Sequence, residues 1–160
     1  MGEFDHALID IEKTLTLDPD NPEYIASKGA ALIGQNLPIE GIGYLNKALL
    51  MSKIGFAYRY RALGNMAIGN IDEYQIFQDI QHAIELSGNL NDYIALARYY
   101  IEYGYYNNAF DALQNALELH RHFGKTYFWL GYYYEQIGDQ QKSSESYKLA
   151  KQYDYYGNGY

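Results

Sequence analysis

The sequence predicts an all-α protein built as a stack of near-identical helix hairpins. Apolar residues recur with helical periodicity along almost the whole chain, and turn residues interrupt this periodicity at intervals that suit helices of roughly three to four turns. Residue types also recur at a spacing of 34, in the pairs Tyr93 and Tyr127, Leu96 and Leu130, Tyr100 and Tyr134, and Gly104 and Gly138. Repeated units pack against their neighbours, so we expect function on a surface rather than in a pocket.

The turn residues divide the chain into its expected helices. They occur at Asp18-Pro19-Asp20-Asn21-Pro22, Gly34-Gln35-Asn36, Gly69-Asn70, Ser87-Gly88-Asn89, Gly104 and Gly138-Asp139. Asn21 followed by Pro22 predicts an N-cap with proline at the first helical position, and Asp72 and Asp139 are expected to cap the helices that follow them. Small residues recur where helices are expected to approach closely, at Gly29, Gly64, Ala97 and Gly131.

Composition excludes several classes of function. The 160 residues are 48% hydrophobic, which argues against disorder, and no apolar run reaches the roughly 18 residues of a membrane-spanning helix. Cysteine is absent, which excludes disulfides, zinc-thiolate sites and thiol catalysis. The absence of cysteine leaves the compartment open, and we favour the cytoplasm. The net charge of −8 makes nucleic acid and anionic membranes poor partners.

The unit that begins at Gly124 carries the most complete repeat pattern. Its residues are Tyr127, Leu130-Gly131, Tyr134, Gly138, Tyr147 and Ala150, with Ser143 at the middle position. This pattern resembles the tetratricopeptide repeat, a helix hairpin with W-x2-L-G-x2-Y followed by A-x3-F and a late alanine. Tyr127 stands at the tryptophan position, and Ser143 replaces the usual middle alanine.

The same pattern extends in phase toward the start of the chain. The late alanines Ala48, Ala83, Ala116 and Ala150 are spaced by 35, 33 and 34 residues. The resemblance implies a right-handed superhelical solenoid of antiparallel helix hairpins over residues 1–160. We expect a half repeat at 1–21 with the second helix only, full repeats at 22–56, 57–89, 90–123 and 124–157, and a tail at 158–160. We also expect the chain to be an excerpt from a longer array, or to pair its ends with another copy.

No constellation of residues predicts catalysis, a metal site or a cofactor. His120-Arg121-His122 contains the only local histidine pair, and its position between repeats indicates a turn. Acidic pairs such as Asp18 and Asp20 lie at helix starts, where negative charge is favourable. Tyrosine is concentrated in the second half, with 15 of 20 residues between Tyr93 and Tyr160. Five of these tyrosines lie outside the core positions of the repeat, and two interpretations of them stay open, a partner surface and thick core packing. They are Tyr99, Tyr103, Tyr105, Tyr132 and Tyr133.

The resemblance implies that first helices line a concave groove. The groove positions that we expect to contact a partner are Tyr58, Arg61, Asn65, Asn91, Arg98, Lys125, Phe128 and Tyr132. Some family members clamp the C-terminal carboxylate of a chaperone peptide, and Arg61, Asn65 and Lys125 occupy clamp positions. The match then fails, because Ala95 and Trp129 replace an asparagine and an arginine.

The expected function is therefore a non-catalytic protein–protein interaction scaffold that binds a peptide or partner segment, with acidic groups in the ligand. Two alternatives stay open. One is a structural spacer or self-assembly segment of a larger protein, associating through the C-terminal end. The other is a small chaperone of the same repeat class.

Overall fold

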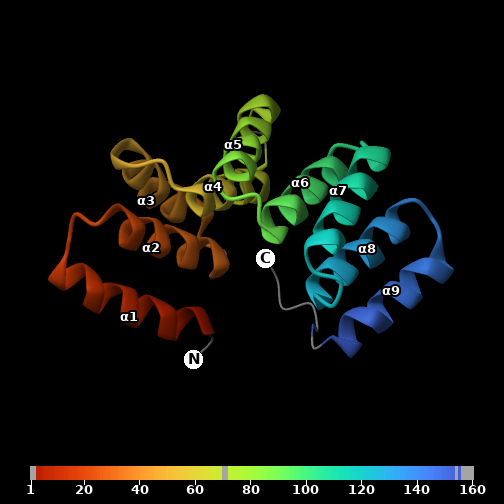
Figure 1. Cartoon of the computed structure of the whole chain (residues 1–160). Coiled ribbons are helices and arrows are strands. Elements are labelled where there is room, and N and C mark those ends of the chain that lie inside the picture. Colours follow the sequence, from red (N-terminus) through yellow and green to blue (C-terminus); the bar gives the residue numbers. More distant parts are fainter. Residues whose placement is uncertain (1–2, 70–71, 154, 156–160) are drawn as a thin grey trace. The chain divides into compact units, whose positions relative to one another are not determined.

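The described residues of the computed structural model, 3–69, 72–153 and 155, form an all-α fold (Figure 1). The helices are α1 (Glu3–Leu17), α2 (Pro22–Gly34), α3 (Pro38–Met51), α4 (Gly55–Ile68), α5 (Glu73–Leu86), α6 (Leu90–Glu102), α7 (Tyr106–Leu119), α8 (Gly124–Gln136) and α9 (Gln140–Gln152). The predicted fold class, a solenoid of helix hairpins, is confirmed. The right-handed course of the whole array and the division into repeats stay predictions.

Helices α1–α5 and α6–α9 form two compact units, which divide between Ser87 and Gly88. We call them unit 1 and unit 2. Within unit 1, α2 packs on α3 and α4 on α5, and α3 joins the two pairs by packing on α4. Within unit 2, α6 packs on α7 and α8 on α9, with α7 against α8. None of the helices in the described part of the chain is long and apolar enough to cross a membrane.

The predicted helix caps are confirmed. The side chain of Asn21 accepts hydrogen bonds from two backbone N–H groups at the start of α2, where Pro22 is the first helical residue. Asp72 and Asp139 each accept from a backbone N–H two or three residues on, at the starts of α5 and α9. Because these bonds satisfy N–H groups that lack an intrahelical partner, the caps fix where the helices begin.

A close helix contact in unit 1 joins two glycines. A Cβ atom on Gly29 of α2 would lie 2.7 Å from the carbonyl oxygen of Gly41 in α3. Likewise, a Cβ atom on Gly41 would lie 2.6 Å from the carbonyl oxygen of Gly29. Leu45 and Ile33 pack beside this contact, and both are fully buried. The backbones of α2 and α3 therefore touch, and no side chain fits between them.

We expect Gly29→Ala to lower the free energy of unfolding by about 1–3 kcal/mol, because the added methyl group overpacks a backbone contact. Gly43 is the matched control, since it also lies inside α3 and a Cβ there meets nothing within 4 Å. Gly43→Ala should raise stability by roughly 0.5–1 kcal/mol through helix propensity. Urea unfolding followed by circular dichroism measures both, and equal effects of the two variants would contradict the close contact.

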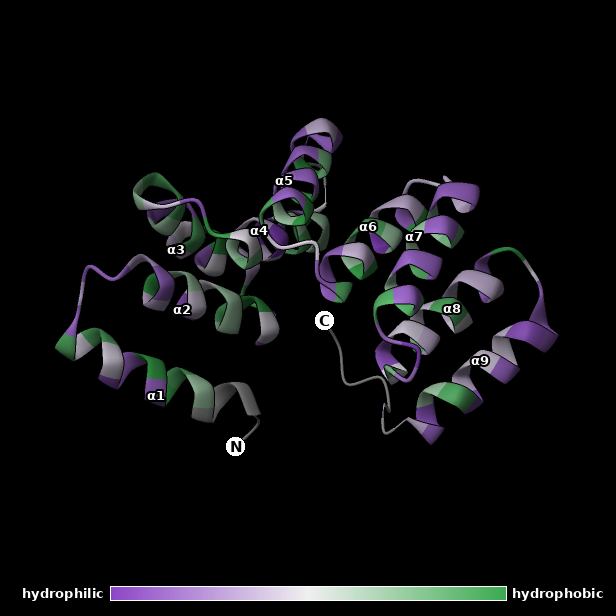
Figure 2. Cartoon of the chain, in the orientation of Figure 1, coloured by the Kyte–Doolittle hydropathy of each residue, from purple (hydrophilic) through white to green (hydrophobic). Residues whose placement is uncertain are grey.

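The additional tyrosines of unit 2 divide between core and surface. Tyr99 and Tyr133 are 5% and 8% exposed and belong to the core, whereas Tyr105 is 49% exposed. Tyr103 and Tyr132 are half-buried. Thick core packing therefore holds for Tyr99 and Tyr133, whereas a partner surface stays a prediction for the exposed Tyr105. Figure 2 shows the corresponding mixture of hydrophobic and hydrophilic residues along the helices.

Candidate partner-binding surface

Arg61, one of three predicted contact residues on α4, is held by the chain itself. Its Nε and Nη2 atoms donate to Oδ2 and Oδ1 of Asp79 on α5, each at 2.7 Å. Its Nη1 atom donates to Oδ1 of Asn46 on α3 at 2.9 Å. The Asp79 side chain is 1% exposed, and the hydrogen bonds to Asp79 raise the pKa of Arg61. Arg61 thus joins three helices, and Asp79 supplies the carboxylate that the clamp hypothesis assigns to a peptide.

The other predicted contact residues of unit 1 also make contacts within the unit. The ring of Tyr58 stacks on His82 of α5, with centroids 4.9 Å apart and an interplanar angle of 18°. The guanidinium of Arg61 lies 5.5 Å from the centroid of the Tyr58 ring. Asn65 is 7% exposed. His82 is half-buried, and its Nδ1 lies 2.8 Å from the carbonyl oxygen of Gln78.

In unit 2, three predicted contact residues gather around Trp129. The guanidinium of Arg98 on α6 lies 4.6 Å from the centroid of the Trp129 ring on α8. Phe128 and Tyr132 meet Trp129 edge to face, with centroids 5.7 Å and 5.5 Å away. We call Arg98, Phe128, Trp129 and Tyr132 the α6–α8 cluster. Cation–π contact and edge-to-face packing hold these four side chains together.

Further aromatic side chains extend this cluster. The ring of Phe128 also contacts Tyr147 of α9 and Tyr155, with centroids 5.6 Å and 5.4 Å away. Burial raises the pKa of Tyr155, and the nearby charge of Arg98 opposes this shift. Burial and a hydrogen bond from its hydroxyl to Glu135 raise the pKa of Tyr147. The cluster is therefore a continuous aromatic surface, an aromatic wall, on which the guanidinium of Arg98 lies.

The remaining predicted contacts lie at the starts of the same two helices. Asn91 and Lys125 are each seven residues, about two helical turns, before Arg98 and Tyr132 respectively, and both are half-buried.

Trp129 was recognised in the sequence only as a departure from the clamp pattern. Its spacing of three residues from Tyr132, on one helix face, was the available signal for its place in the cluster.

The described residues show no grouping of three histidine, cysteine, aspartate or glutamate side chains that would hold a metal ion. His120, Arg121 and His122 lie exposed in the loop between α7 and α8. The His122 ring contacts Tyr153 at a centroid distance of 5.1 Å. This placement agrees with the interpretation of the histidine pair as part of a turn.

The hairpins and the α6–α8 cluster define the class of the protein, a helical-repeat protein whose candidate site is a surface. Residues 124–155 match the tetratricopeptide-repeat family. The predicted resemblance is therefore confirmed, and the number of repeats stays a prediction. A search of curated protein sequences found no match.

Solved structures agree on the fold. The crystal structure of MamA is 24% identical with a TM-score of 0.67, over 96% of this chain and 90% of MamA. TTC0263, a thermophilic tetratricopeptide-repeat protein of Thermus thermophilus, is 16% identical with a TM-score of 0.83, over 94% of this chain and 83% of its own. A chain of the APC/C hetero-tetramer Cut9–Hcn1 is 15% identical with a TM-score of 0.78, over 94% of this chain and 30% of its own. At these identities the likeness shows the fold alone.

Proposed function

We propose that the chain is a non-catalytic scaffold that binds a segment of a partner protein on the inner face of its first helices. Tetratricopeptide-repeat proteins are generally scaffolds without catalytic activity, and residues 124–155 match this family. A similar fold occurs in the Cut9–Hcn1 hetero-tetramer, an assembly of proteins. Both observations support a protein partner.

The α6–α8 cluster is the observation that carries the proposal. Aromatic rings offer a binding partner apolar area with few rotatable bonds, and tyrosine, tryptophan and arginine are enriched among residues that dominate binding energy. The guanidinium of Arg98 lies on this aromatic wall, in a chain whose net charge is −8. A carboxylate of the partner would form charge-assisted hydrogen bonds there. The favoured ligand is therefore a segment with acidic and apolar side chains.

Two other predicted residues flank this central contact. Asn91 and Lys125, on the same helices, extend the surface by about two turns, and Lys125 adds a second cation. On α4 of unit 1, Tyr58 is the corresponding candidate contact, whereas Asn65 is 7% exposed and offers a partner little surface. Arg61 is assigned a different role, the stabilisation of unit 1 through Asp79.

A phage-displayed library of random peptides tests the proposal. Peptides selected on the protein should be enriched in aspartate and glutamate. Arg98→Glu should weaken a selected peptide by about tenfold or more, because a charge-assisted hydrogen bond contributes about 1.5–3 kcal/mol and 1.4 kcal/mol is tenfold. Arg121→Glu, the same change of charge in an exposed loop of unit 2, is the matched control. Fluorescence anisotropy with labelled peptide gives the affinities.

Unchanged affinity in a folded Arg98→Glu variant would refute this binding surface. A library that yields no binders, together with concentration-dependent self-association in light scattering, would favour the alternative of a self-assembling spacer.

A further inference from the structure

Three positions in unit 1 pack the α2–α3 hairpin onto α4, which is the first helix of the following hairpin. A Cβ atom on Gly64 of α4 would lie 2.9 Å from Ile33 of α2 and 3.1 Å from Ile42 of α3, so both isoleucines rest against α4. Leu49, near the end of α3, packs in the core cluster that includes Ala57 of α4. The positions lie in the last turn of the first helix and in the early and late parts of the second helix.

The same positions in unit 2 pack α6 and α7 onto α8. Ile101 belongs to the core cluster that includes Leu130 and Tyr133 of α8, and the partly buried Phe110 and Leu117 pack against this cluster. The rings of Phe110 and Tyr133 are 5.7 Å apart between centroids. These three positions are therefore the stacking positions of a hairpin.

Counted from the small residue of each first helix and the late alanine of each second helix, the stacking positions occur in four hairpins. They hold Ile33, Ile42 and Leu49 in α2–α3, Ile68, Phe77 and Ile84 in α4–α5, Ile101, Phe110 and Leu117 in α6–α7, and Glu135, Ser144 and Lys151 in α8–α9. All three are apolar in the first three hairpins. All three are polar in the last, which no longer offers a surface for an apolar helix.

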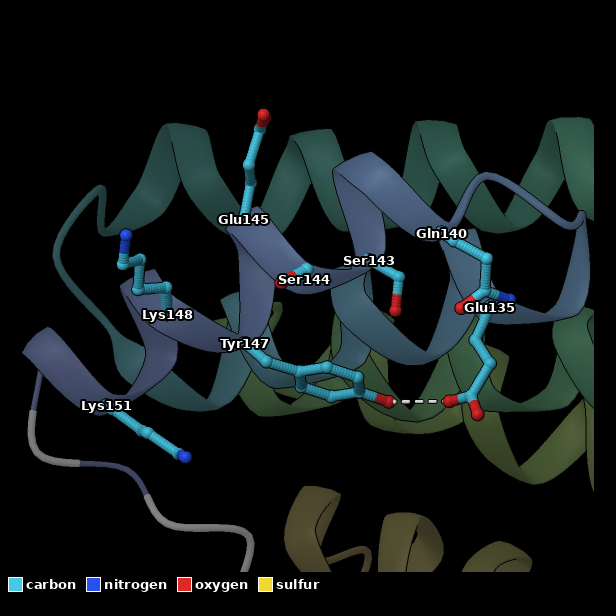
Figure 3. Close-up of a pocket in the computed structure, with 8 residues that line it drawn as sticks. All are labelled: Glu135, Gln140, Ser143, Ser144, Glu145, Tyr147, Lys148 and Lys151. Atoms are coloured by element: carbon cyan, nitrogen blue, oxygen red, sulfur yellow. Dashed lines mark hydrogen bonds between the residues drawn. The ribbon is translucent and has the colours of Figure 1, made fainter.

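The polar stacking positions lie together in the structure. They line a surface hollow of about 480 Å³ at the end of unit 2, formed by Glu135, Gln140, Ser143, Ser144, Glu145, Tyr147, Lys148 and Lys151 (Figure 3). The hydroxyl of Tyr147 donates to Oε2 of Glu135 at 3.0 Å across it. Glu135, Ser144 and Lys151 are all exposed. Hydrophilic residues also predominate along α9 (Figure 2).

We propose that α9 and the end of α8 form a polar cap, which prevents a further repeat or a second copy of the chain from stacking on this face. An apolar helix placed here would bury the charges of Glu135 and Lys151 without offering them partners, which is unfavourable. Helical stacks need a polar outer face where stacking stops. The cap is independent of which ligand the α6–α8 cluster binds.

The two described tyrosines that follow α9 pack within unit 2. Tyr153 and Tyr155 turn back onto α8, where their rings lie 5.4 Å from those of Tyr127 and Phe128. Tyr156 and Tyr160 lie outside the described residues. Self-association through this end of the chain is accordingly disfavoured.

A gain of association tests the cap. The triple variant Glu135→Ile, Ser144→Phe and Lys151→Leu gives α8–α9 the stacking residues of α6–α7. Light scattering coupled to size exclusion should find the natural chain monomeric at all concentrations, and the triple variant with a mass that rises toward twofold as concentration increases. The polar variant Glu135→Gln, Ser144→Asn and Lys151→Gln, the matched control, should stay monomeric.

Two outcomes would overturn the cap. One is a natural chain that dimerises and becomes monomeric when Ser144→Arg blocks the hollow. The other is a triple variant that stays monomeric while its circular dichroism shows full helix content. Should the triple variant fail to fold, Ser144→Phe with Lys151→Leu keeps the Glu135–Tyr147 hydrogen bond. This double variant is expected to associate as well, and a folded, monomeric double variant would equally reject the proposal.

Discussion

Arg61→Ala is expected to destabilise unit 1 by about 3–5 kcal/mol, since removing one partner of a buried ion pair leaves the other charge uncompensated. Asp79 would keep a carboxylate that is 1% exposed, with a 3.3 Å hydrogen bond from Gln75 but without the two 2.7 Å bonds from Arg61. Asn46 would lose its contact with the guanidinium as well. Three helices are joined at this point, so the loss affects α3, α4 and α5 together.

A double replacement separates the ion pair from the site that holds it. Arg61→Met with Asp79→Leu fills similar volume with apolar groups, and such exchanges are often neutral or stabilising by about 1–4 kcal/mol. Urea unfolding followed by circular dichroism gives the free energies of unfolding. If Arg61→Ala costs less than about 1 kcal/mol, the pair behaves as an ordinary surface salt bridge, contrary to its observed burial.

Alkaline pH is expected to unfold unit 2 through tyrosines that are buried or half-buried. Burial is the first cause that raises the pKa of Tyr100, Tyr127, Tyr133, Tyr147 and Tyr155. The unfolded chain therefore loses these protons at lower pH than the folded chain. The stability that the neutral hydroxyls contribute is complete below the ordinary tyrosine pKa of about 10, and it falls as the pH rises toward the raised values.

Urea midpoints measured between about pH 9 and about pH 12 test this dependence. Tyr147→Phe keeps the ring and removes the hydroxyl that donates to Glu135, so the variant should lose less stability across this range than the natural chain. Tyr74→Phe, at an exposed ring on α5 of unit 1, is the control. Equal pH dependence in the natural chain and Tyr147→Phe would show that burial of this hydroxyl is not responsible.

The sequence predicts the helices because their signals are local. Periodic apolar residues and the caps at Asn21, Asp72 and Asp139 act within a few residues, and the structure places helix starts where they indicate. The spacing of 34 predicts hairpins for the same reason, since each hairpin repeats one pattern. Arg98, Phe128 and Tyr132 were assigned to one surface from their repeat positions, and the structure brings them together around Trp129.

Contacts that occur in only one repeat could not be predicted from the repeat pattern. Asp79 has small residues, Ala112 and Ser146, at the corresponding positions of the later hairpins, so the repeat gives no reason to pair it with Arg61. That pairing depends on how α4 and α5 are rotated about their axes. The burial of Tyr99 and Tyr133 likewise depends on the helix face they occupy, whereas the exposed Tyr105 precedes α7 as its N-cap residue.

The indole N–H resonance of Trp129 tests the central claim most directly. Trp129 is the only tryptophan in the chain, so this resonance reports from the α6–α8 cluster alone. We predict that titration with an acidic peptide selected from the library shifts the resonance, with a midpoint equal to that of the anisotropy titration. Saturation of the anisotropy while the indole resonance stays unchanged would place the ligand elsewhere and contradict the account.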